Sequence, residues 1–250
     1  MTLQALVFDV DGTLAETEEA HRLSFNETFR ESGLPWDWSV ADYERLLGTT
    51  GGRQRILRHM AEVGFVPPGG QEAEAFARKL HERKTALYNE RLRSGGVPFR
   101  PGVVRLIREA KAAGLKLAIA TTTSPENVST LLAASGGPEA GDWFDVIGAG
   151  NCVPALKPAP DIYLWVLERL GLPAAACLAL EDSRNGLRAA LAAGLPVVAT
   201  VATYTRHDDL TGALAVVCDL GDPDAPCRPV AADMRGKSFV DLALLRFWRE

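Results

Sequence analysis

Short apolar runs alternate along the chain with segments in which apolar residues recur at helical spacing. The apolar runs are short and continuous, as in strands buried on both faces, and the first, at 3–10, has β-branched and aromatic members. Comparable runs lie at 115–120, 176–180 and 196–201, with weaker examples at 144–147 and 213–217. The helix-period segments between them are 102–113, 125–134, 161–170 and 183–193. This alternation predicts a parallel sheet covered on both faces, that is, an α/β core of the Rossmann-like, doubly wound type.

The stretch from residue 16 to residue 94 interrupts the alternation. It has no convincing strand run and shows four helical patterns, at 18–31, 40–47, 52–63 and 71–93. We therefore expect an all-helical cap domain of residues 16–94, inserted into an α/β core domain of residues 1–15 and 95–250. Near the other end of the chain, a Pro- and Asp-rich stretch at 221–229 predicts a surface loop before a final helix at 238–248.

Composition and charge narrow the possible functions. The chain has 250 residues, of which 47% are hydrophobic and 24% are charged, as is ordinary for a soluble globular protein. Lys plus Arg number 27 against 32 for Asp plus Glu, and the net charge of −5 argues against nucleic-acid binding. Any anionic ligand must then be held locally, and we expect a monomer with a small-molecule partner.

Targeting signals and cysteine spacing indicate the compartment. No apolar run approaches the roughly 18 residues that a membrane span needs, and the first residues lack the basic start of a secretion signal. Cys152, Cys177, Cys218 and Cys227 are widely spaced, without a CxxC pair. We expect a cytoplasmic protein without membrane attachment, whose thiols mostly pack in the interior and form no disulfide.

Polar residues follow the predicted strands, at the edge where open parallel sheets bind ligands. Two carboxylates stand at the tip of the first strand, hydroxyls follow the second, an acidic pair follows the strand at 176–180, and a lysine precedes the helix at 161–170. These residues are Asp9, Asp11, Thr121, Thr122, Thr123, Lys157, Glu181 and Asp182.

This set predicts a metal site for phosphoryl transfer. Convergence of Asp9, Asp11 and Asp182 would crowd like charges, which costs several kcal/mol unless a cation lies among them. Oxygen ligands without His or Cys favour Mg²⁺, which commonly completes its coordination with a substrate phosphate. Lys157 and the donors that begin the helix after Thr121 can bind a phosphoryl group.

These motifs, in this order, resemble those of the haloacid dehalogenase superfamily. They are DVDGTL at 9–14, the apolar strand ending at Thr121, Lys157 in LKPAPD, and Glu181-Asp182 in LEDSRNG. The resemblance spans nearly the whole chain. The cap directly after the first motif, and the strings TEEAH and LKPAPDIY, are most similar to the CbbY-type sugar-phosphate phosphatases, close to β-phosphoglucomutase. Known members of that type hydrolyse xylulose 1,5-bisphosphate, a misfire product that inhibits Rubisco.

The resemblance implies a role for each of these residues, in a reaction that yields xylulose 5-phosphate. Asp9 would be the nucleophile that forms an aspartyl phosphate. Asp11 would protonate the leaving sugar oxygen and then deprotonate the attacking water. The groups implied to hold the phosphoryl oxygens are Thr121, Thr122, Thr123 and Lys157. The implied magnesium ligands are Asp9, the Asp11 carbonyl, Asp182 and, as a further ligand or as a neighbour of the ligands, Glu181.

Polar residues of the expected cap are candidates for binding the rest of the substrate. Glu18 and His21 share a helical face with apolar residues, which indicates a wet cleft, although a buried core histidine fits the same pattern. Lys84 also lies on an apolar face, as a snorkelling lysine would. The resemblance to the mutase assigns Lys84, and Arg53 in a flexible loop, to a distal phosphate. The candidate residues are Glu18, His21, Thr50, Gly51, Gly52, Arg53 and Lys84.

Three other functions share parts of this pattern. A β-phosphoglucomutase-like phosphomutase uses the same motifs and intermediate, and it differs in whether water or a second sugar hydroxyl meets the aspartyl phosphate. A receiver-type signalling module also has an acceptor Asp, an acidic cluster, a Thr and a Lys, but it explains neither Asp11 nor the cap. Carbon–halogen hydrolysis on the same fold does not call for a metal, so Asp11 fits it less well.

Overall fold

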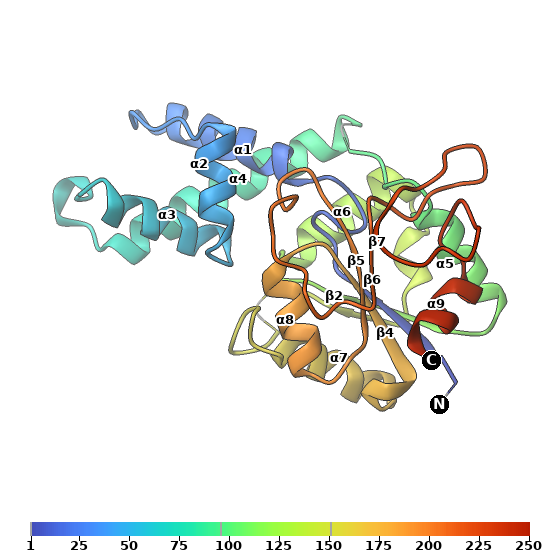
Figure 1. Cartoon of the computed structure of the whole chain (residues 1–250). Helices are drawn as coiled ribbons and strands as arrows, with labels where there is room; N and C mark the ends of the chain where they lie inside the picture. The colour runs from blue at the N-terminus through green and yellow to red at the C-terminus, as the bar shows by residue number, and fades with distance from the viewer. Residues whose placement is uncertain (1, 96, 151) are drawn as a thin grey trace. The chain divides into compact units, whose positions relative to one another are not determined.

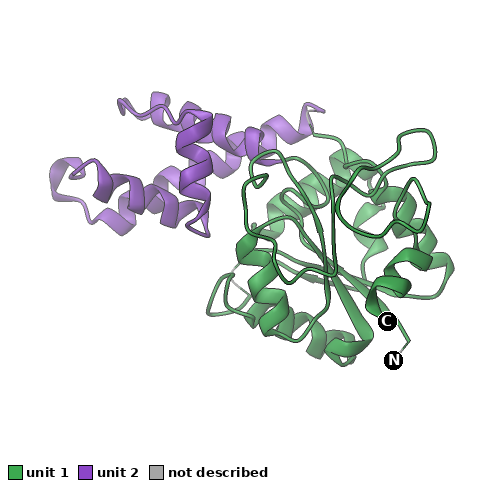
Figure 2. Ribbon diagram, in the orientation of Figure 1, with its two compact units in different colours: residues 1–16, 97–250 green, residues 17–96 purple. Residues whose placement is uncertain are grey.

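The computed structural model describes residues 2–95, 97–150 and 152–250. It divides into two compact units, coloured separately in Figure 2. We call residues 1–16 with 97–250 the sheet unit and residues 17–96 the helical unit.

The described residues of the sheet unit form a seven-stranded sheet in the order β3-β2-β1-β4-β5-β6-β7 (Figure 1). Neighbouring strands are parallel, except for β6 and β7. The residues of β1, β4 and β5 are buried throughout, as their continuous apolar runs predict. The strands are β1 (Ala5–Phe8), β2 (Lys116–Ala120), β3 (Val146–Gly148), β4 (Cys177–Glu181), β5 (Val197–Thr200), β6 (Ala215–Val217) and β7 (Pro229–Ala231).

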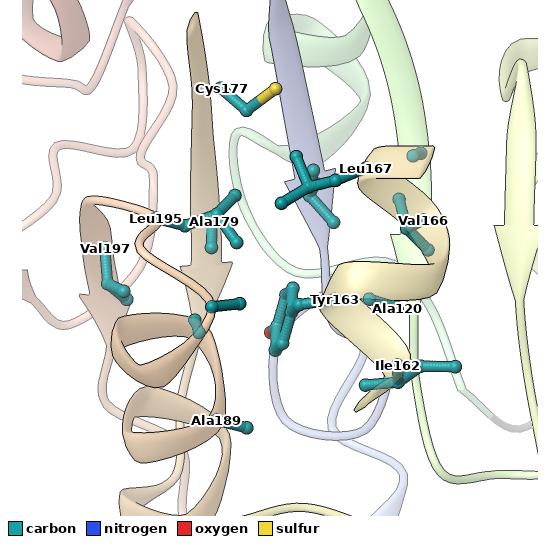
Figure 3. Close-up of a cluster of buried hydrophobic side chains, with 14 of the residues drawn as sticks. Ala120, Ile162, Tyr163, Val166, Leu167, Cys177, Ala179, Ala189, Leu195 and Val197 are labelled. Atoms are coloured by element: carbon teal, nitrogen blue, oxygen red, sulfur yellow. The ribbon is translucent and has the colours of Figure 1, made fainter. Parts of the chain in front are cut away.

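Helices cover both faces of the sheet. The chain runs from β1 through β2 to β3 at one edge and from β4 through β5 to β6 towards the other, so right-handed crossovers place the connecting helices on opposite faces. On one face, α7 and α8 bury the cluster of side chains drawn in Figure 3. The helices are α5 (Val103–Ala112), α6 (Pro125–Gly136), α7 (Asp161–Leu170), α8 (Arg184–Ala192) and α9 (Leu242–Arg249), with 3₁₀ turns at Ala140–Trp143 and Ala174–Ala176.

The end of the chain differs from the prediction. Strand β7 was not expected: it pairs antiparallel with β6 and is exposed along its length, so it lacks a buried apolar run. The final helix begins at Leu242 and not at residue 238. The side chain of Asp241 accepts a hydrogen bond from the backbone N–H of Leu244 and caps the helix at that point.

The helical unit is built around aromatic rings. On α1, Phe25 and Phe29 each contact Trp38 with ring centroids 4.8 Å apart, and Tyr43 of α2 packs against Phe25. Phe25 and Phe29 are buried and form the inward face of α1. The helices are α1 (Glu18–Glu31), α2 (Val40–Leu47), α3 (Gly52–Glu62) and α4 (Ala73–Arg93), with a 3₁₀ turn at Pro68–Gly70.

Within the described ranges, no helix combines the length and the apolar character that crossing a membrane requires.

The four cysteines are free thiols: Cys152, Cys177, Cys218 and Cys227. Burial raises the pKa of Cys177 and of Cys227 to about 11, so both stay protonated at neutral pH. Cys218 is partly buried, and Cys152, in the loop before α7, is exposed.

Candidate active site

The register of β1 and β4 brings an acidic cluster together at the carboxyl edge of the sheet. Phe8 lies beside Leu180, so Asp9 follows one strand where Glu181 ends the other, and the Asp9 N–H donates to the Leu180 carbonyl at 3.0 Å. One carboxylate oxygen from each of Asp9, Glu181 and Asp182 lies within 4.8 Å of the others. All three side chains are buried. Residues far apart in sequence thus form one site because their strands are neighbours.

Lys157 lies between two of these carboxylates. Its Nζ is 2.6 Å from Asp9 Oδ1 and 2.6 Å from Glu181 Oε1, and the side chain is buried. Although burial opposes it, the charges of Asp9 and Glu181 raise the pKa of Lys157 above its usual value, so the ammonium stays charged. The lysine that precedes α7 therefore reaches the ends of β1 and β4.

Glu181 is enclosed by donors from the protein. Its Oε1 accepts from Lys157 and from the Tyr163 hydroxyl, the latter at 2.6 Å. Its Oε2 accepts from the Asp182 N–H at 3.2 Å and from the Ser183 hydroxyl at 3.4 Å. The side chain packs so closely on α8 that a Cβ at Gly186 would lie 1.9 Å from Oε2. These contacts favour a role for Glu181 in holding Lys157 beside the cluster.

Asp182 contacts the loop that follows β1. Its Oδ2 accepts from the Thr205 hydroxyl at 2.9 Å. A Cβ at Gly12 would lie 2.1 Å from the same oxygen, and Gly12 has a φ of 83°. Only glycine allows both the close approach and this backbone conformation. Asp11, one residue earlier, is partly exposed and forms a β-bridge with Ala15.

Hydroxyl and amide donors flank the cluster on the other side of β1. Thr121 follows β2, is buried, and donates its N–H to the Gly148 carbonyl at 3.0 Å. Its Oγ1 accepts from the Thr123 N–H at 3.3 Å, and Thr123 in turn accepts from Asn127 at 3.1 Å. Thr122 is partly exposed. Because Ser124 caps α6, this loop lies at the amino end of a twelve-residue helix, where anions are stabilised.

Two candidate residues of the helical unit are joined to each other. The ring of His21 stacks on Tyr88 with centroids 3.9 Å apart, and His21 Nδ1 contacts the ammonium of Lys84. Lys84 Nζ also lies 4.8 Å from the ring centroid of Phe25 and 5.0 Å from that of Tyr88. Both His21 and Lys84 are buried, so Lys84 is held by its surroundings and does not snorkel to solvent.

Four of the remaining candidates, Thr50, Gly51, Gly52 and Arg53, lie at the start of α3, and the fifth, Glu18, begins α1. Gly51 precedes this helix with a φ of 95°, and a Cβ at Gly52 would lie 2.6 Å from His81 Nε2. Arg53 is exposed, with its Nε 3.7 Å from a carboxylate oxygen of Glu74, and Thr50 is partly exposed. Glu18 accepts from the Tyr43 hydroxyl at 2.7 Å.

The acidic cluster fits a divalent cation with oxygen ligands. Burial raises the pKa of Asp9 to about 8 against the lowering effect of Lys157, with Glu181 and Asp11 adding to the rise. Lys157 supplies one positive charge against three buried carboxylates, so Asp9 needs further positive charge nearby to be ionised at neutral pH. The donors are carboxylate oxygens, which Mg²⁺ prefers as ligands, whereas softer metals prefer nitrogen or sulfur.

Comparison with known proteins decides the family. The family model for the haloacid dehalogenase-like hydrolases matches residues 3–194. The chain belongs to this family. The assignment made from its ordered motifs is therefore confirmed, and this haloacid dehalogenase-like hydrolase is an enzyme of the phosphatase class.

CbbY proteins are similar to this hydrolase over most of its length. It is 55% identical to Protein CbbY of Rhodobacter capsulatus, covering 85% of this chain and 92% of that one. It is 48% identical to the plasmid-borne Protein CbbY of Cupriavidus necator, covering 98% and 96%. A crystal structure of a mutant CbbY from Rhodobacter sphaeroides in complex with xylulose 1,5-bisphosphate matches with a TM-score of 0.79 and 45% identity, covering 86% of this chain and 93% of that chain.

Three residues that contact the site of this hydrolase were not predicted. Tyr163 lies on the buried face of α7, so its helical spacing indicates only a core residue. The one feature of the sequence that could have indicated its contact with Glu181 is a hydroxyl group six residues after Lys157. Thr205 lies in a loop whose path the sequence does not show. Arg100 precedes α5, and its guanidinium contacts main-chain carbonyls, which leave no pattern in a sequence.

Proposed function

We propose that this hydrolase is a magnesium-dependent phosphatase of a small phosphorylated sugar, with xylulose 1,5-bisphosphate as substrate and xylulose 5-phosphate and inorganic phosphate as products. The observation that carries the proposal is the buried cluster of Asp9, Glu181 and Asp182 with Lys157 among them. The similarity to the CbbY structure that holds xylulose 1,5-bisphosphate supports the choice of sugar. We propose a cytoplasmic monomer.

In the first step, a carboxylate oxygen of Asp9 bonds to phosphorus while the bond between phosphorus and the sugar oxygen breaks. Asp11 gives a proton to the sugar oxygen as it leaves. Water then attacks the phosphorus of the aspartyl phosphate, Asp11 takes a proton from that water, and the bond to Asp9 breaks. The partial exposure of Asp11 supports this role, since a group that exchanges protons with solvent must be accessible.

The other residues of the sheet unit would hold the charge that develops on the phosphoryl group. Magnesium, when bound by Asp9, Asp182 and the Asp11 carbonyl, supplies positive charge to the phosphoryl oxygens. Lys157 and Thr121 supply hydrogen bonds, together with Thr122 and Thr123 at the amino end of α6. Glu181 holds Lys157 in place through the contact at 2.6 Å.

The helical unit is proposed to act as a cap that binds the end of the substrate away from the reacting phosphate. A bisphosphate sugar carries a second phosphate that needs cationic groups. Exposed Arg53 can form a forked contact with that phosphate, next to the backbone of Thr50, Gly51 and Gly52. Lys84 would also bind the second phosphate, and Glu18 and His21 would bind sugar hydroxyls.

The proposal is tested by incubating the purified chain with xylulose 1,5-bisphosphate and Mg²⁺. We expect release of one equivalent of phosphate with xylulose 5-phosphate as the product in ³¹P NMR, loss of activity in excess EDTA, and recovery with added Mg²⁺. A panel of hexose and pentose phosphates gives the comparison rates. Isomerisation of β-glucose 1-phosphate without phosphate release would indicate a mutase, and a phosphoaspartate stable for minutes would indicate a signalling module.

A further inference from the structure

Arg100 is a buried cation at the base of the loop that carries the first motif. Its guanidinium contacts the main-chain carbonyl of Gly12. The same group donates to the carbonyl of Val201 at 2.7 Å and to that of Cys218 at 2.6 Å. It also lies 3.2 Å from the Thr200 hydroxyl. One side chain thus joins the loop after β1 to the ends of β5 and β6.

The backbone of Arg100 joins the same loop. Its N–H donates to the Leu14 carbonyl at 2.9 Å, and the preceding residue, Phe99, forms a β-bridge with Ala15. Within the loop, the Gly12 N–H donates to the Ala15 carbonyl at 2.8 Å. Arg100 therefore stands where the chain has returned from the helical unit to the sheet unit, and it contacts residues 12–15 through both its side chain and its main chain.

The position of Gly12 matters for the acidic cluster. Gly12 follows Asp11 directly, and it packs on Asp182 so closely that a Cβ would lie 2.1 Å from the carboxylate. A shift of the Gly12 peptide would move Asp11 relative to Asp9 and would disturb the packing on Asp182. A guanidinium can hold such a carbonyl firmly because its donors are charged and set in a rigid plane.

We propose that Arg100 is a positioning residue for the phosphatase reaction: by holding the Gly12 carbonyl, it sets the place of Asp11 and of the Asp11 carbonyl relative to Asp9 and Asp182. It acts through the loop, and no contact with the substrate is required. This inference rests on the proposed function, since Asp11 is given its acid–base role there.

Arg105 offers a matched control. It lies on α5, and it too donates to main-chain carbonyls, that of Gly221 at 2.7 Å and that of Val240 at 2.9 Å. The Arg105 guanidinium also packs over the ring of Phe239. Both arginines therefore stabilise the sheet unit through carbonyl contacts. Apart from Glu109 on the same helix, the contacts of Arg105 are with the segment after β6 and not with residues 12–15.

The experiment compares Arg100→Met, Arg100→Lys and Arg105→Met in the full chain. For Arg100→Met we expect kcat on xylulose 1,5-bisphosphate to fall about 10²-fold with a smaller change in KM, as expected for misplaced catalytic groups. Binding of Mn²⁺ without substrate, measured by calorimetry, should weaken about tenfold. Arg100→Lys, which keeps one charged donor, should recover part of both. Arg105→Met should lose a similar amount of thermal stability while keeping kcat and Mn²⁺ affinity.

Two results would overturn the inference. In the first, Arg100→Met loses stability as Arg105→Met does, but keeps kcat and Mn²⁺ affinity. In the second, Arg100→Met does not fold and Arg100→Lys folds with wild-type kcat and Mn²⁺ affinity. If the wild-type chain releases no phosphate from any sugar phosphate, the proposed function has failed, whereas the Mn²⁺ affinities of the same variants still decide whether Arg100 positions the loop at the acidic cluster.

Discussion

In the sheet unit the candidate groups gather at the ends of neighbouring strands, whereas in the helical unit they lie along helices whose other residues form an aromatic core. Asp9, Glu181 and Asp182 are brought together by backbone pairing, and they carry more negative charge than Lys157 can balance. In the helical unit, His21 and Lys84 contact each other beside aromatic rings.

This difference suggests a division of labour. The strand register sets the positions of the acidic residues through main-chain pairing, which substitution of a neighbouring side chain leaves in place. The groups of the helical unit are held by contacts between side chains, which substitution alters locally. We therefore expect changes in the sheet unit to affect kcat and changes in the helical unit to affect KM.

The largest effect is expected from Asp9→Asn. The amide keeps the shape of the side chain but cannot form the aspartyl phosphate, so phosphate release should fall by at least about 10³-fold. Steady-state phosphate release measures the change, and circular dichroism shows whether the fold is kept. Asp142→Asn, an exposed residue of a 3₁₀ turn, serves as the control and should keep the wild-type rate. A rate for Asp9→Asn within about tenfold of wild type would remove Asp9 as the nucleophile.

Arg53→Ala should change KM and leave kcat close to wild type. Loss of a charged contact with a distal phosphate should raise KM for a bisphosphate about tenfold. For a monophosphate of the same sugar the change should be much smaller. Arg45→Ala is the control, because Arg45 is an exposed arginine of the same unit that pairs with Glu62. Equal effects on both substrates would show that Arg53 does not contact the distal phosphate.

Tyr163→Phe and Tyr43→Phe compare the two units directly, since each hydroxyl donates to a glutamate. Loss of the contact with Glu181, at 2.6 Å, should lower kcat about fivefold, because Lys157 is then held less firmly. Loss of the contact with Glu18, at 2.7 Å, should raise KM instead. Steady-state kcat and KM of both variants, measured on the same substrate, test this difference. A fall in kcat for Tyr43→Phe alone would reverse the proposed division.

The smallest effect concerns the pH dependence of stability. Burial, with help from Lys84 and His21, lowers the pKa of His81 to about 3 from its usual value of 6.5. Between these pH values the unfolded chain binds more protons at this histidine than the folded chain does. The free energy of unfolding is therefore unaffected by His81 above pH 6.5 and decreases as the pH falls from 6.5 towards 3. Urea unfolding at pH 7.5 and pH 5 should show a smaller loss in His81→Gln than in wild type. His207→Gln, at an exposed position, should behave as wild type.

Much of the fold was predictable because it depends on local pattern. Buried parallel strands leave continuous apolar runs. The runs at 3–10, 115–120 and 196–201 contain β1, β2 and β5, and the run at 176–180 contains all of β4 except its last residue, Glu181. β7 was missed because an exposed edge strand of three residues has no such run. The start of α9 depended on the cap at Asp241, which is a single side-chain contact.

Residues at strand ends could be chosen as candidates from sequence alone, because parallel sheets place those ends at one edge. The sequence did not show the contacts of Lys157 with Asp9 and Glu181, or the pairing of His21 with Lys84. Those depend on side chains separated by 148, 24 and 63 positions along the chain.

The sequence by itself predicted the alternation of strands and helices, the four helical segments that follow the first strand and the polar residues at the strand ends. It could do so because burial and strand or helix spacing are properties of short segments. Only the tertiary structure showed which carboxylates contact Lys157, why residue 12 must be glycine, and that Arg100 contacts the loop of the first motif. Those features depend on which backbone and side-chain groups meet after the chain has folded, and contacts with carbonyl groups leave no trace in residue order.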